Sequence, residues 1–427
     1  MTGYASRRGI LKSAAHVAAL GALMLNRTGL ASAREQGALR ADTTNKIDAL
    51  LHAAVDAGDL PGVVAMAAGD NGIIYEGAFG TRRLLDDDAM TRDTVFRVAS
   101  MIKPITTVAA LQLVERDRLS LDAPVPSIEP ALGAPQVLDG FDEQGRPQLR
   151  PAKRPILLRE LLTHTSGFAY RLWDAKAVKY IEALARMPAK DRKNLPPTPL
   201  MFDPGERWQY GGGLDWVGRL VEVASGEPLD VYFRRNIFDP LGMHDTAFVI
   251  SPAQQAREAS GHRRMPDGSL IAEPRERQMA RRRFSGGGGI YSTAPDYLTF
   301  IRTLLHGGVR DGSRILRPET VALMGRNQIG RLEAGRMRTT APQFSNDVDF
   351  FPGISLKWGF GHMINMQPIP GGRSAGSLTW GGLFNTYYWI DPQKRIAAVF
   401  MTQIVPFADP RALGVYGAFE RAIYAMV

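Results

Sequence analysis

The chain has 427 residues, more than one domain usually holds, and 44% of them are apolar while 22% are charged. This ordinary globular composition excludes a disordered, collagen-like or coiled-coil chain. The sequence contains no cysteine, which excludes disulfides, zinc–thiolate sites and thiol nucleophiles together.

Residues 1–33 have the pattern of an export signal. Arg7 and Arg8 precede a short apolar run over 14–25, and Ala-Ser-Ala at 31–33 offers a cleavage site. The S-R-R-x-hydrophobic-L-K order resembles the twin-arginine motif, so we expect the twin-arginine export machinery as a partner. The apolar run is too short to span a bilayer, which predicts no stable membrane anchor. We therefore expect a periplasmic or secreted protein.

The charge of the mature chain gives little support for a nucleic-acid partner. Removing 1–33 takes away four basic residues and no acidic one, so the formal net charge falls from +9 by four to +5. The densest basic run, 274–284, lacks interleaved aromatic residues and any nucleic-acid motif. We expect no nucleic-acid partner.

The predicted elements follow in chain order. Residues 43–62 have apolar residues at helical spacing and end at Pro-Gly. Residues 63–80 form two strand-like runs around Asp70-Asn71-Gly72, a strong hairpin signal. Ser100 opens a helix that continues to Val114, and residues from about 120 to 285 are rich in helical patterns. After 286 we expect glycine turns, one helix at 294–308 and strands at 386–391 and 396–403.

Strands at both ends with helices between them predict one discontinuous domain. We expect an α+β fold in which an antiparallel sheet is flanked by helices and interrupted by a mostly helical insertion. The predicted boundaries are 34–98 and 286–427 for the sheet domain and 99–285 for the helical domain.

Ser100 and Lys103 stand one helical turn apart in the stretch Ser100-Met101-Ile102-Lys103-Pro104. A serine hydroxyl needs a base within hydrogen-bond reach, and side chains at i and i+3 share a helix face. Burial lowers the pKa of a lysine because desolvation disfavours the charged amine. A serine at a helix start also has a free N–H for an oxyanion. Taken alone, however, S-x-x-K fits a capping serine beside a surface lysine better.

Two further segments favour the catalytic interpretation. Tyr210 follows a turn and precedes a helix, and a tyrosine beside an ammonium can exchange a proton with the serine. Trp380-Gly381-Gly382 forms a glycine-lined strand on which a substrate can approach the backbone. Ser100, Lys103 and Tyr210 together make a plausible proton relay.

These motifs resemble the serine β-lactamase and penicillin-binding-protein-like hydrolases, in particular the class C-like family VIII carboxylesterases. The similarity includes the stretches at 100–104, 161–168, 240–248 and 286–300 and runs from about residue 45 to the end. The resemblance implies a β-lactamase/transpeptidase-like fold, with Ser100 as the acylated nucleophile. It also implies that Lys103 and Tyr210 share acid–base work and that the N–H groups of Ser100 and Leu383 form the oxyanion hole.

Departures from the β-lactamase motifs bear on the substrate. Where those enzymes have Y-x-N and K-T-G, this chain has Tyr210-Gly-Gly and Trp380-Gly-Gly. A lysine there would hold a substrate carboxylate, whereas a tryptophan offers an apolar wall. We therefore expect a serine carboxylesterase that cleaves neutral, partly hydrophobic esters as its small-molecule substrate. The alternatives are acyl transfer, a β-lactamase or D-Ala-type peptidase, and a non-catalytic module that binds peptidoglycan fragments or β-lactams.

Two other residues invite catalytic interpretations that we do not favour. Gly372 to Gly376 fits the G-x-S-x-G motif around Ser374, but every histidine precedes it, whereas an α/β-hydrolase needs its histidine afterwards. His164 lies among turn and capping residues, which favours a structural hydrogen-bonding role. Metal-ligand and phosphate-loop spacings are missing, so we expect no metal and no cofactor.

Overall fold

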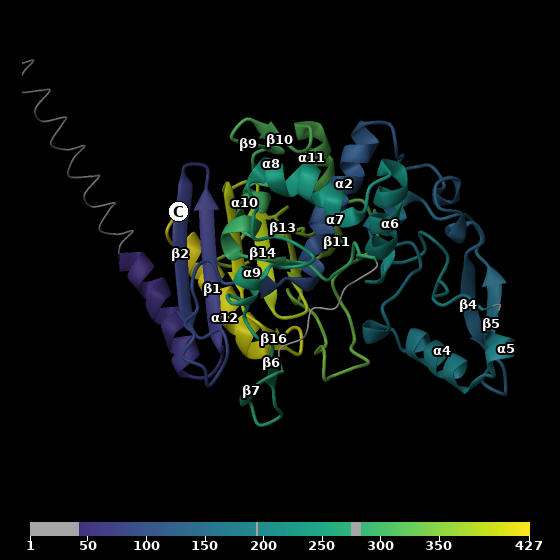
Figure 1. Cartoon of the computed structure of the whole chain (residues 1–427), viewed down its shortest axis with the longest axis horizontal. Coiled ribbons are helices and arrows are strands. Elements are labelled where there is room, and N and C mark those ends of the chain that lie inside the picture. The colour runs from purple at the N-terminus through teal and green to yellow at the C-terminus, as the bar shows by residue number, and fades with distance from the viewer. Residues whose placement is uncertain (1–41, 194, 275–282) are drawn as a thin grey trace, which may run out of the picture.

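Figure 1 shows the computed structural model of the chain, which describes residues 42–427 apart from 194 and 275–282. The predicted export signal, residues 1–33, lies outside the described part, as does most of the basic run 274–284. Within the described part, no helix combines the length and the apolar character needed to cross a membrane.

A seven-stranded antiparallel sheet combines strands from the two ends of the chain, as predicted. The strand order is β11-β12-β13-β14-β15-β1-β2. In chain order the strands are Gly62–Gly69 (β1), Gly72–Gly80 (β2), Leu356–Trp358 (β11), Met363–Asn365 (β12), Leu378–Gly382 (β13), Thr386–Asp391 (β14) and Ile396–Met401 (β15). Pairing of β1 with β15 joins the N-terminal hairpin to the C-terminal strands.

The N-terminal hairpin forms where the sequence predicts it, with a difference in its turn. Gly69 pairs with Gly72, so Asp70 and Asn71 form a two-residue loop. The Asn-Gly pair therefore does not occupy both central positions of the turn. Gly72 instead begins the returning strand at a φ of 128°, a conformation that side chains rarely allow.

Three helices follow residue 286 among the described residues, where one was expected. They are Ala294–Leu305 (α10), Pro318–Met324 (α11) and Pro410–Tyr424 (α12). The helix α10 lies inside the predicted range, but the expectation of a single helix is wrong. Gly414 and Gly417 weaken the helical pattern of α12, although Asp409 caps this helix by accepting from the Ala412 N–H.

Both faces of the sheet are covered by helices (Figure 1). Successive side chains of a strand point to opposite faces. On β14, Tyr388 packs against Tyr297 of α10, while Tyr387 packs against Tyr416 of α12. All six residues of β14 are buried in consequence. The strand is accordingly aromatic and apolar from Tyr387 to Ile390, between Thr386 and Asp391 at its ends.

Most regular elements in the middle of the chain are helices. Its helices are Ile102–Glu115 (α2), Leu158–Leu162 (α3), Ala175–Arg186 (α4), Ala189–Arg192 (α5), Gly213–Ser225 (α6), Leu229–Phe233 (α7), Asp239–Leu241 (α8) and Pro252–Gln255 (α9). The helix α2 is buried at every residue from Ile102 to Leu113, which is typical of a core helix. It stands between the sheet and α6 (Figure 1).

Short strands accompany these helices, and sequence patterns did not indicate them. They are Phe96–Arg97 (β3), Gln136–Phe141 (β4), Pro147–Pro151 (β5), His262–Arg264 (β6), Leu270–Ala272 (β7), Tyr291–Ser292 (β8), Val309–Arg310 (β9), Ser313–Arg314 (β10) and Ile404–Val405 (β16). Because β6 pairs in parallel with β16, part of the predicted helical region docks on the C-terminal segment. The domain boundaries at 98 and 285 stay predictions.

A buried ion pair ties α12 to the loop between β12 and β13. Arg373 is fully buried and donates from Nε and Nη2 to the two carboxylate oxygens of Glu420, at 2.8 and 2.7 Å. The Glu420 carboxylate also accepts from the Arg373 backbone N–H, and Tyr416 binds the same guanidinium. Removal of one partner would leave a charge buried without compensation.

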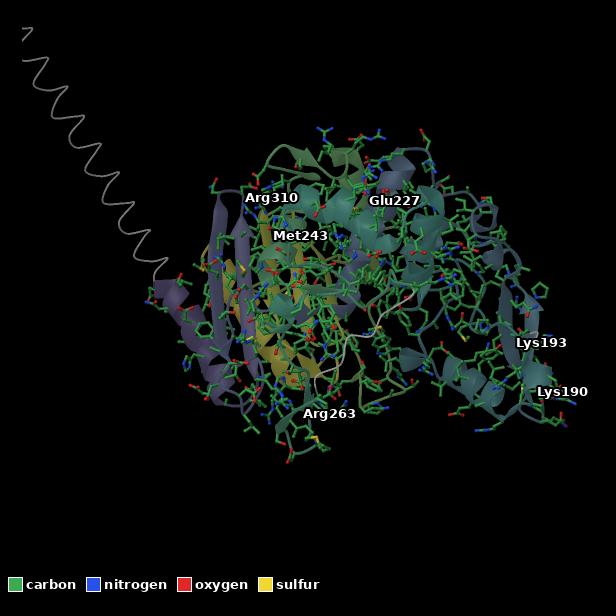
Figure 2. The ribbon with its side chains drawn as sticks, viewed as in Figure 1. Lys190, Lys193, Glu227, Met243, Arg263 and Arg310 are labelled. Carbon is green, nitrogen blue, oxygen red and sulfur yellow. The ribbon has the colours of Figure 1, made fainter. Side chains whose placement is uncertain are left out.

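We predict that Glu420→Ala lowers the free energy of unfolding by about 3–5 kcal/mol, because Arg373 loses its counter-charge in the core. Glu227 offers a matched control, since it pairs with Arg235 at 2.7 Å near the surface (Figure 2). Glu227→Ala should cost at most about 1 kcal/mol. Chemical denaturation measures the free energy of unfolding of both variants. Equal losses would show that burial does not increase the contribution of the pair between Arg373 and Glu420.

Three histidines are buried in the fold, and each has a lowered pKa. Burial lowers the pKa of His262 to about 4 and that of His362 to about 3. Burial, together with the charge of Lys103, lowers the pKa of His164 well below its usual value. Asp296 changes in the opposite sense, because burial raises the pKa of its carboxyl to about 6.

These shifts predict that the protein loses stability as the pH falls from 6.5 to 4.5. Below pH 6.5 the unfolded chain protonates all three histidines while the folded chain does not, so acid favours unfolding. Asp296 opposes this, because the folded state binds its proton first. The unfolded state therefore binds a net two protons more than the folded state. The free energy of unfolding then falls by about 2–3 kcal/mol for each pH unit.

Denaturant titrations at pH 6.5, 5.5 and 4.5 test this dependence. His362→Gln should remove about one proton from this difference and so make the dependence of stability on pH less steep. Stability that is constant or higher at pH 4.5 would contradict the prediction.

Candidate active site

Ser100 lies on a tight turn that leads into α2. The turn is a 3-10 helix over Ala99–Met101, and α2 begins at Ile102. Ala99 has a φ of 43°, in the left-handed region that a residue with a side chain seldom occupies. The strained residue therefore directly precedes the proposed nucleophile, as is common where a reactive group is held in place.

Lys103 is fully buried and touches Ser100. Its Nζ lies 3.0 Å from Ser100 Oγ and 2.7 Å from the carbonyl oxygen of Gly287. The same Nζ lies 5.4 and 4.9 Å from the ring centres of Tyr170 and Tyr210. No carboxylate of the described residues pairs with this lysine. The structure thus brings Ser100 and Lys103 together and excludes the surface lysine that S-x-x-K alone could indicate.

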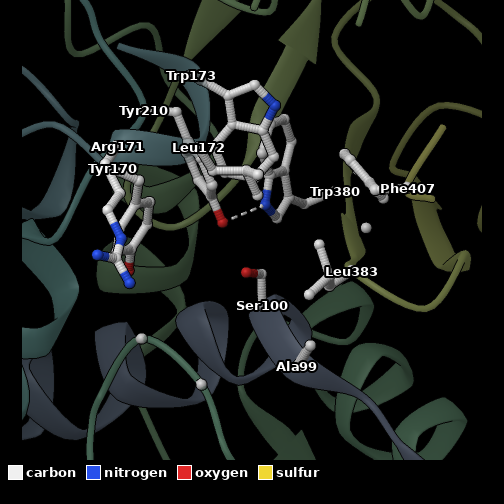
Figure 3. A pocket seen from close by; sticks show the side chains of 13 residues that line it. Ala99, Ser100, Tyr170, Arg171, Leu172, Trp173, Tyr210, Trp380, Leu383 and Phe407 are labelled. Carbon is white, nitrogen blue, oxygen red and sulfur yellow. Dashed lines mark hydrogen bonds between the residues drawn. The ribbon is translucent and has the colours of Figure 1, made fainter. Parts of the chain in front are cut away.

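Tyr210 completes the predicted group from the other side. It is buried just before α6, and its hydroxyl points toward Ser100 (Figure 3). The indole Nε1 of Trp380 donates to the Tyr210 hydroxyl at 3.1 Å. Trp380 is therefore a hydrogen-bond donor as well as the apolar wall that the sequence predicts. Since the Tyr210 oxygen accepts from Trp380, its own proton is directed away from the indole.

Glycines let three chain segments approach one another around the site. A Cβ atom on Gly211 would lie 2.0 Å from the Phe168 carbonyl oxygen, and one on Gly382 would lie 2.3 Å from that of Val98. Gly382 thus brings β13 against the turn that carries Ser100. It does not line the pocket itself, unlike Gly381. Gly382 has a packing role here, and the predicted substrate contact at this residue stays a prediction.

The proposed oxyanion donors face a common space. Ser100 and Leu383 both line the pocket, and Figure 3 shows their side chains next to each other. The backbone N–H groups of these two residues make no hydrogen bond with the described part of the chain. They are free to bind an oxyanion.

The pocket above Ser100 has a volume of about 330 Å³ and is mostly apolar. Its larger lining side chains are Tyr170, Leu172, Trp173, Tyr210, Trp380, Leu383 and Phe407. Arg171 is the single charged residue of this lining among those described, and it is exposed. The space next to the nucleophile suits an uncharged group.

Several of these residues carried no signal in the sequence. Tyr170, Trp173 and Phe407 come from segments without a recognisable motif and meet only in the folded chain. Gly287 lies in a run of four glycines, but nothing in the run indicates that its carbonyl receives Lys103. Trp173 and Tyr170 both pack their rings on Tyr210, at 5.3 and 5.5 Å between centres.

His164 packs against Tyr210. Among the described residues it forms no hydrogen bond with Ser100. Its Nδ1 accepts from the Gly211 N–H at 3.3 Å, and its ring packs 4.6 Å from that of Tyr210. With its pKa well below the usual value, the imidazole is neutral at pH 7. These contacts are the structural role that the sequence favours.

Ser374 lies away from this pocket, on the loop before β13. Its N–H donates to Asp391 at 2.8 Å, and its carbonyl accepts from Asn365 and Ser377. The three contacts describe a structural turn. Among the described residues no group of three or more metal-ligating side chains is placed to hold a metal ion.

Comparisons with known proteins place this geometry in a family. The beta-lactamase family model matches residues 47–422. The chain is 34% identical over 416 residues to the monacolin J acid methylbutanoyltransferase of Aspergillus terreus, covering 91% of this chain and 97% of that protein. It is 33% identical over 376 residues to the lovastatin esterase of Penicillium rubens, covering 84% and 92%.

A solved structure agrees with these matches. The LovD9 mutant of simvastatin synthase from Aspergillus terreus superposes with a TM-score of 0.78 at 31% identity, covering 90% of this chain and 98% of that one. The predicted β-lactamase/transpeptidase-like fold is confirmed. The sheet, the family match and these relatives together show that the chain belongs to the beta-lactamase family, within the superfamily of serine β-lactamases and penicillin-binding proteins.

Proposed function

We propose that this beta-lactamase-fold enzyme is a serine carboxylesterase that cleaves neutral, partly hydrophobic esters through an acyl-enzyme on Ser100. The observation that carries the proposal is the 3.0 Å contact between Lys103 Nζ and Ser100 Oγ at the base of an apolar pocket. A buried amine beside a hydroxyl is the arrangement that an activated serine requires.

In the acylation step, Ser100 Oγ attacks the ester carbonyl carbon, and Lys103 and Tyr210 accept the hydroxyl proton between them. The carbonyl oxygen becomes an oxyanion that binds the N–H groups of Ser100 and Leu383. The carbon–oxygen bond to the alcohol then breaks, and the alcohol leaves with a proton from Tyr210. A water molecule repeats the sequence on the acyl-enzyme and releases the acid.

The pocket lining supports a neutral acyl group. Where a β-lactamase or a D-Ala-type peptidase has a lysine, this chain places the buried indole of Trp380, which is already bonded to Tyr210. Arg171 lies at an exposed position, where water screens its charge. The residues that line the pocket therefore offer a substrate carboxylate no buried cation in exchange for its lost hydration.

Acyl transfer is the second candidate, and the relatives favour it. The chain aligns with 97% of a protein named as a methylbutanoyltransferase. Transfer differs from hydrolysis only in the acceptor, because an alcohol then attacks the acyl-enzyme in place of water. An added hydrophobic alcohol separates the two, since transfer yields a new ester and hydrolysis yields only acid. Export through the twin-arginine machinery, based on residues 1–33, remains part of the proposal.

We predict that Ser100→Ala lowers ester turnover by about 10³-fold or more, because the nucleophile is lost. The test uses intact-mass spectrometry of the wild type and the variant, each mixed with a short-chain aryl ester or with a fluorophosphonate. The wild type should gain one adduct and Ser100→Ala none.

Ser374→Ala is the matched control, because it removes the other serine in a hydrolase-like motif. This variant should keep both its adduct and its turnover. An adduct that survives in Ser100→Ala would contradict the assignment, and a wild type without any adduct would favour the non-catalytic binding module.

We predict that Trp380→Phe lowers kcat about 5- to 10-fold and changes KM less than about 2-fold. Phenylalanine keeps the apolar wall but removes the donor to Tyr210, a loss of about 1 kcal/mol. Trp389→Phe is the control, since this buried indole has no described hydrogen-bond partner and lies on the α12 side of the sheet. Steady-state kinetics with an aryl butyrate measures both. A raised KM with unchanged kcat would contradict this role and show that Trp380 contributes only apolar contact with the substrate.

A further inference from the structure

The turn over residues 285–288 receives the amine of Lys103, yet glycines make up most of it. Gly286 and Gly287 have no side chains to fix their backbone, and glycine is the most permissive residue in φ and ψ. Lys103 nevertheless depends on the carbonyl of Gly287 as one of its two acceptors. Some other group must hold this turn in place.

The peptide group between Gly286 and Gly287 is fixed at both ends. Its carbonyl oxygen accepts from Thr106 Oγ1 at 2.7 Å, and its N–H donates to Ser285 Oγ at 2.9 Å. Thr106 belongs to α2, as Lys103 does. The backbone that presents the Gly287 carbonyl is thus attached to the helix that carries the lysine.

Asp215 anchors the other side of this turn. It lies in the first turn of α6, and one carboxylate oxygen accepts from the Ser285 hydroxyl. The other carboxylate oxygen accepts from the Tyr170 hydroxyl at 2.7 Å. Asp215 is partly buried and forms no ion pair with any described residue. Its charge is directed at two hydroxyl groups of the site, and hydrogen bonds to a charged acceptor are the strong ones.

Packing at Gly287 shows how closely these groups fit. A Cβ atom there would lie 2.7 Å from an Asp215 oxygen and 2.7 Å from the Tyr170 hydroxyl. The carboxylate and the phenol therefore pack directly against this glycine. The turn has little room to shift toward these atoms.

We propose that Asp215 and Ser285 are positioning residues that hold the Gly287 carbonyl against Lys103 and so keep Nζ within reach of Ser100. The hydrogen bonds run from Asp215 through Ser285 and the Gly287 backbone to Lys103 and end at the nucleophile. The inference rests on the proposed function. It assigns to two residues outside the Ser-Lys-Tyr group a role in the rate of acylation.

The test compares Ser285→Ala and Asp215→Asn with the wild type. Each variant should lower kcat for an aryl ester, and the rate of fluorophosphonate labelling, by about 10- to 100-fold, because small misplacements of catalytic groups have effects of this size. KM should change less than about 2-fold, since neither residue lines the pocket. Ser285→Thr keeps the hydroxyl and should restore at least half of the activity.

The double variant Ser285→Ala/Asp215→Asn should be no slower than the slower single variant, because the two residues act in one chain of bonds. Thr246→Ala is the matched control. Thr246 is also buried and donates to a carboxylate, that of Asp296, at 2.9 Å, but neither residue lines the pocket. It should lower stability and leave kcat unchanged.

Three outcomes would overturn the inference. The first is multiplied losses in the double variant. The second is activity that falls only as much as the folded fraction falls in thermal denaturation. The third is a rise in KM at constant kcat. An active wild type with any of these results leaves the proposed function standing, whereas a wild type without turnover or adduct overturns the proposed function itself.

Discussion

The structure depends on one buried amine, that of Lys103, which pairs with no carboxylate among the residues that the structure describes. Lys103 sits inside the molecule, and its N–H groups are satisfied by the hydroxyl of Ser100, on the turn before α2, and by the carbonyl of residue 287. An unsatisfied ammonium or amine in the core would be costly, so these two segments must meet whenever the chain is folded. The helix α2 and the turn at 285–288 therefore have to dock on each other. The rings of Tyr170 and Tyr210 pack around the other sides of Lys103 Nζ. They bring the mostly helical region of the chain into contact with this atom.

Close backbone approach explains why the site forms at this place. Gly382 brings β13 against the nucleophile turn, Gly211 brings the segment after Tyr210 against Phe168, and Gly287 leaves room for a carboxylate. A side chain at any of these positions would separate two segments that the site needs together. Helices and strands form the framework. Because these glycines have no side chains, backbones approach closely, and this approach sets the distances between the proposed catalytic groups. The antiparallel sheet, with both faces covered, supplies a rigid support for Trp380 and Leu383.

Local sequence patterns were sufficient to predict much of the fold and to select the proposed catalytic residues. The hairpin β1–β2, the strands β14 and β15, the helix α6 and the Ser100–Lys103 pair are all determined by residues close together in sequence. Their spacing could therefore be recognised. The helix α12 was missed because its two glycines obscure the periodicity, and Asp215 and Ser285 were missed because they are 70 residues apart. Trp380 was expected as a wall, but its indole donor has meaning only once Tyr210 is placed beside it.

The bond between Trp380 and Tyr210 also constrains how this enzyme can diverge. One side chain forms part of the pocket wall and binds the hydroxyl to which we assign proton transfer, so we expect a substitution at 380 to alter substrate range and chemistry together. Leu172, Leu383 and Phe407 line the same pocket with side chains that contain no hydrogen-bonding atom. Lineages that acquire bulkier or smaller acyl groups can change these three positions one at a time. The tryptophan is the part of the wall on which such adaptation has the least freedom.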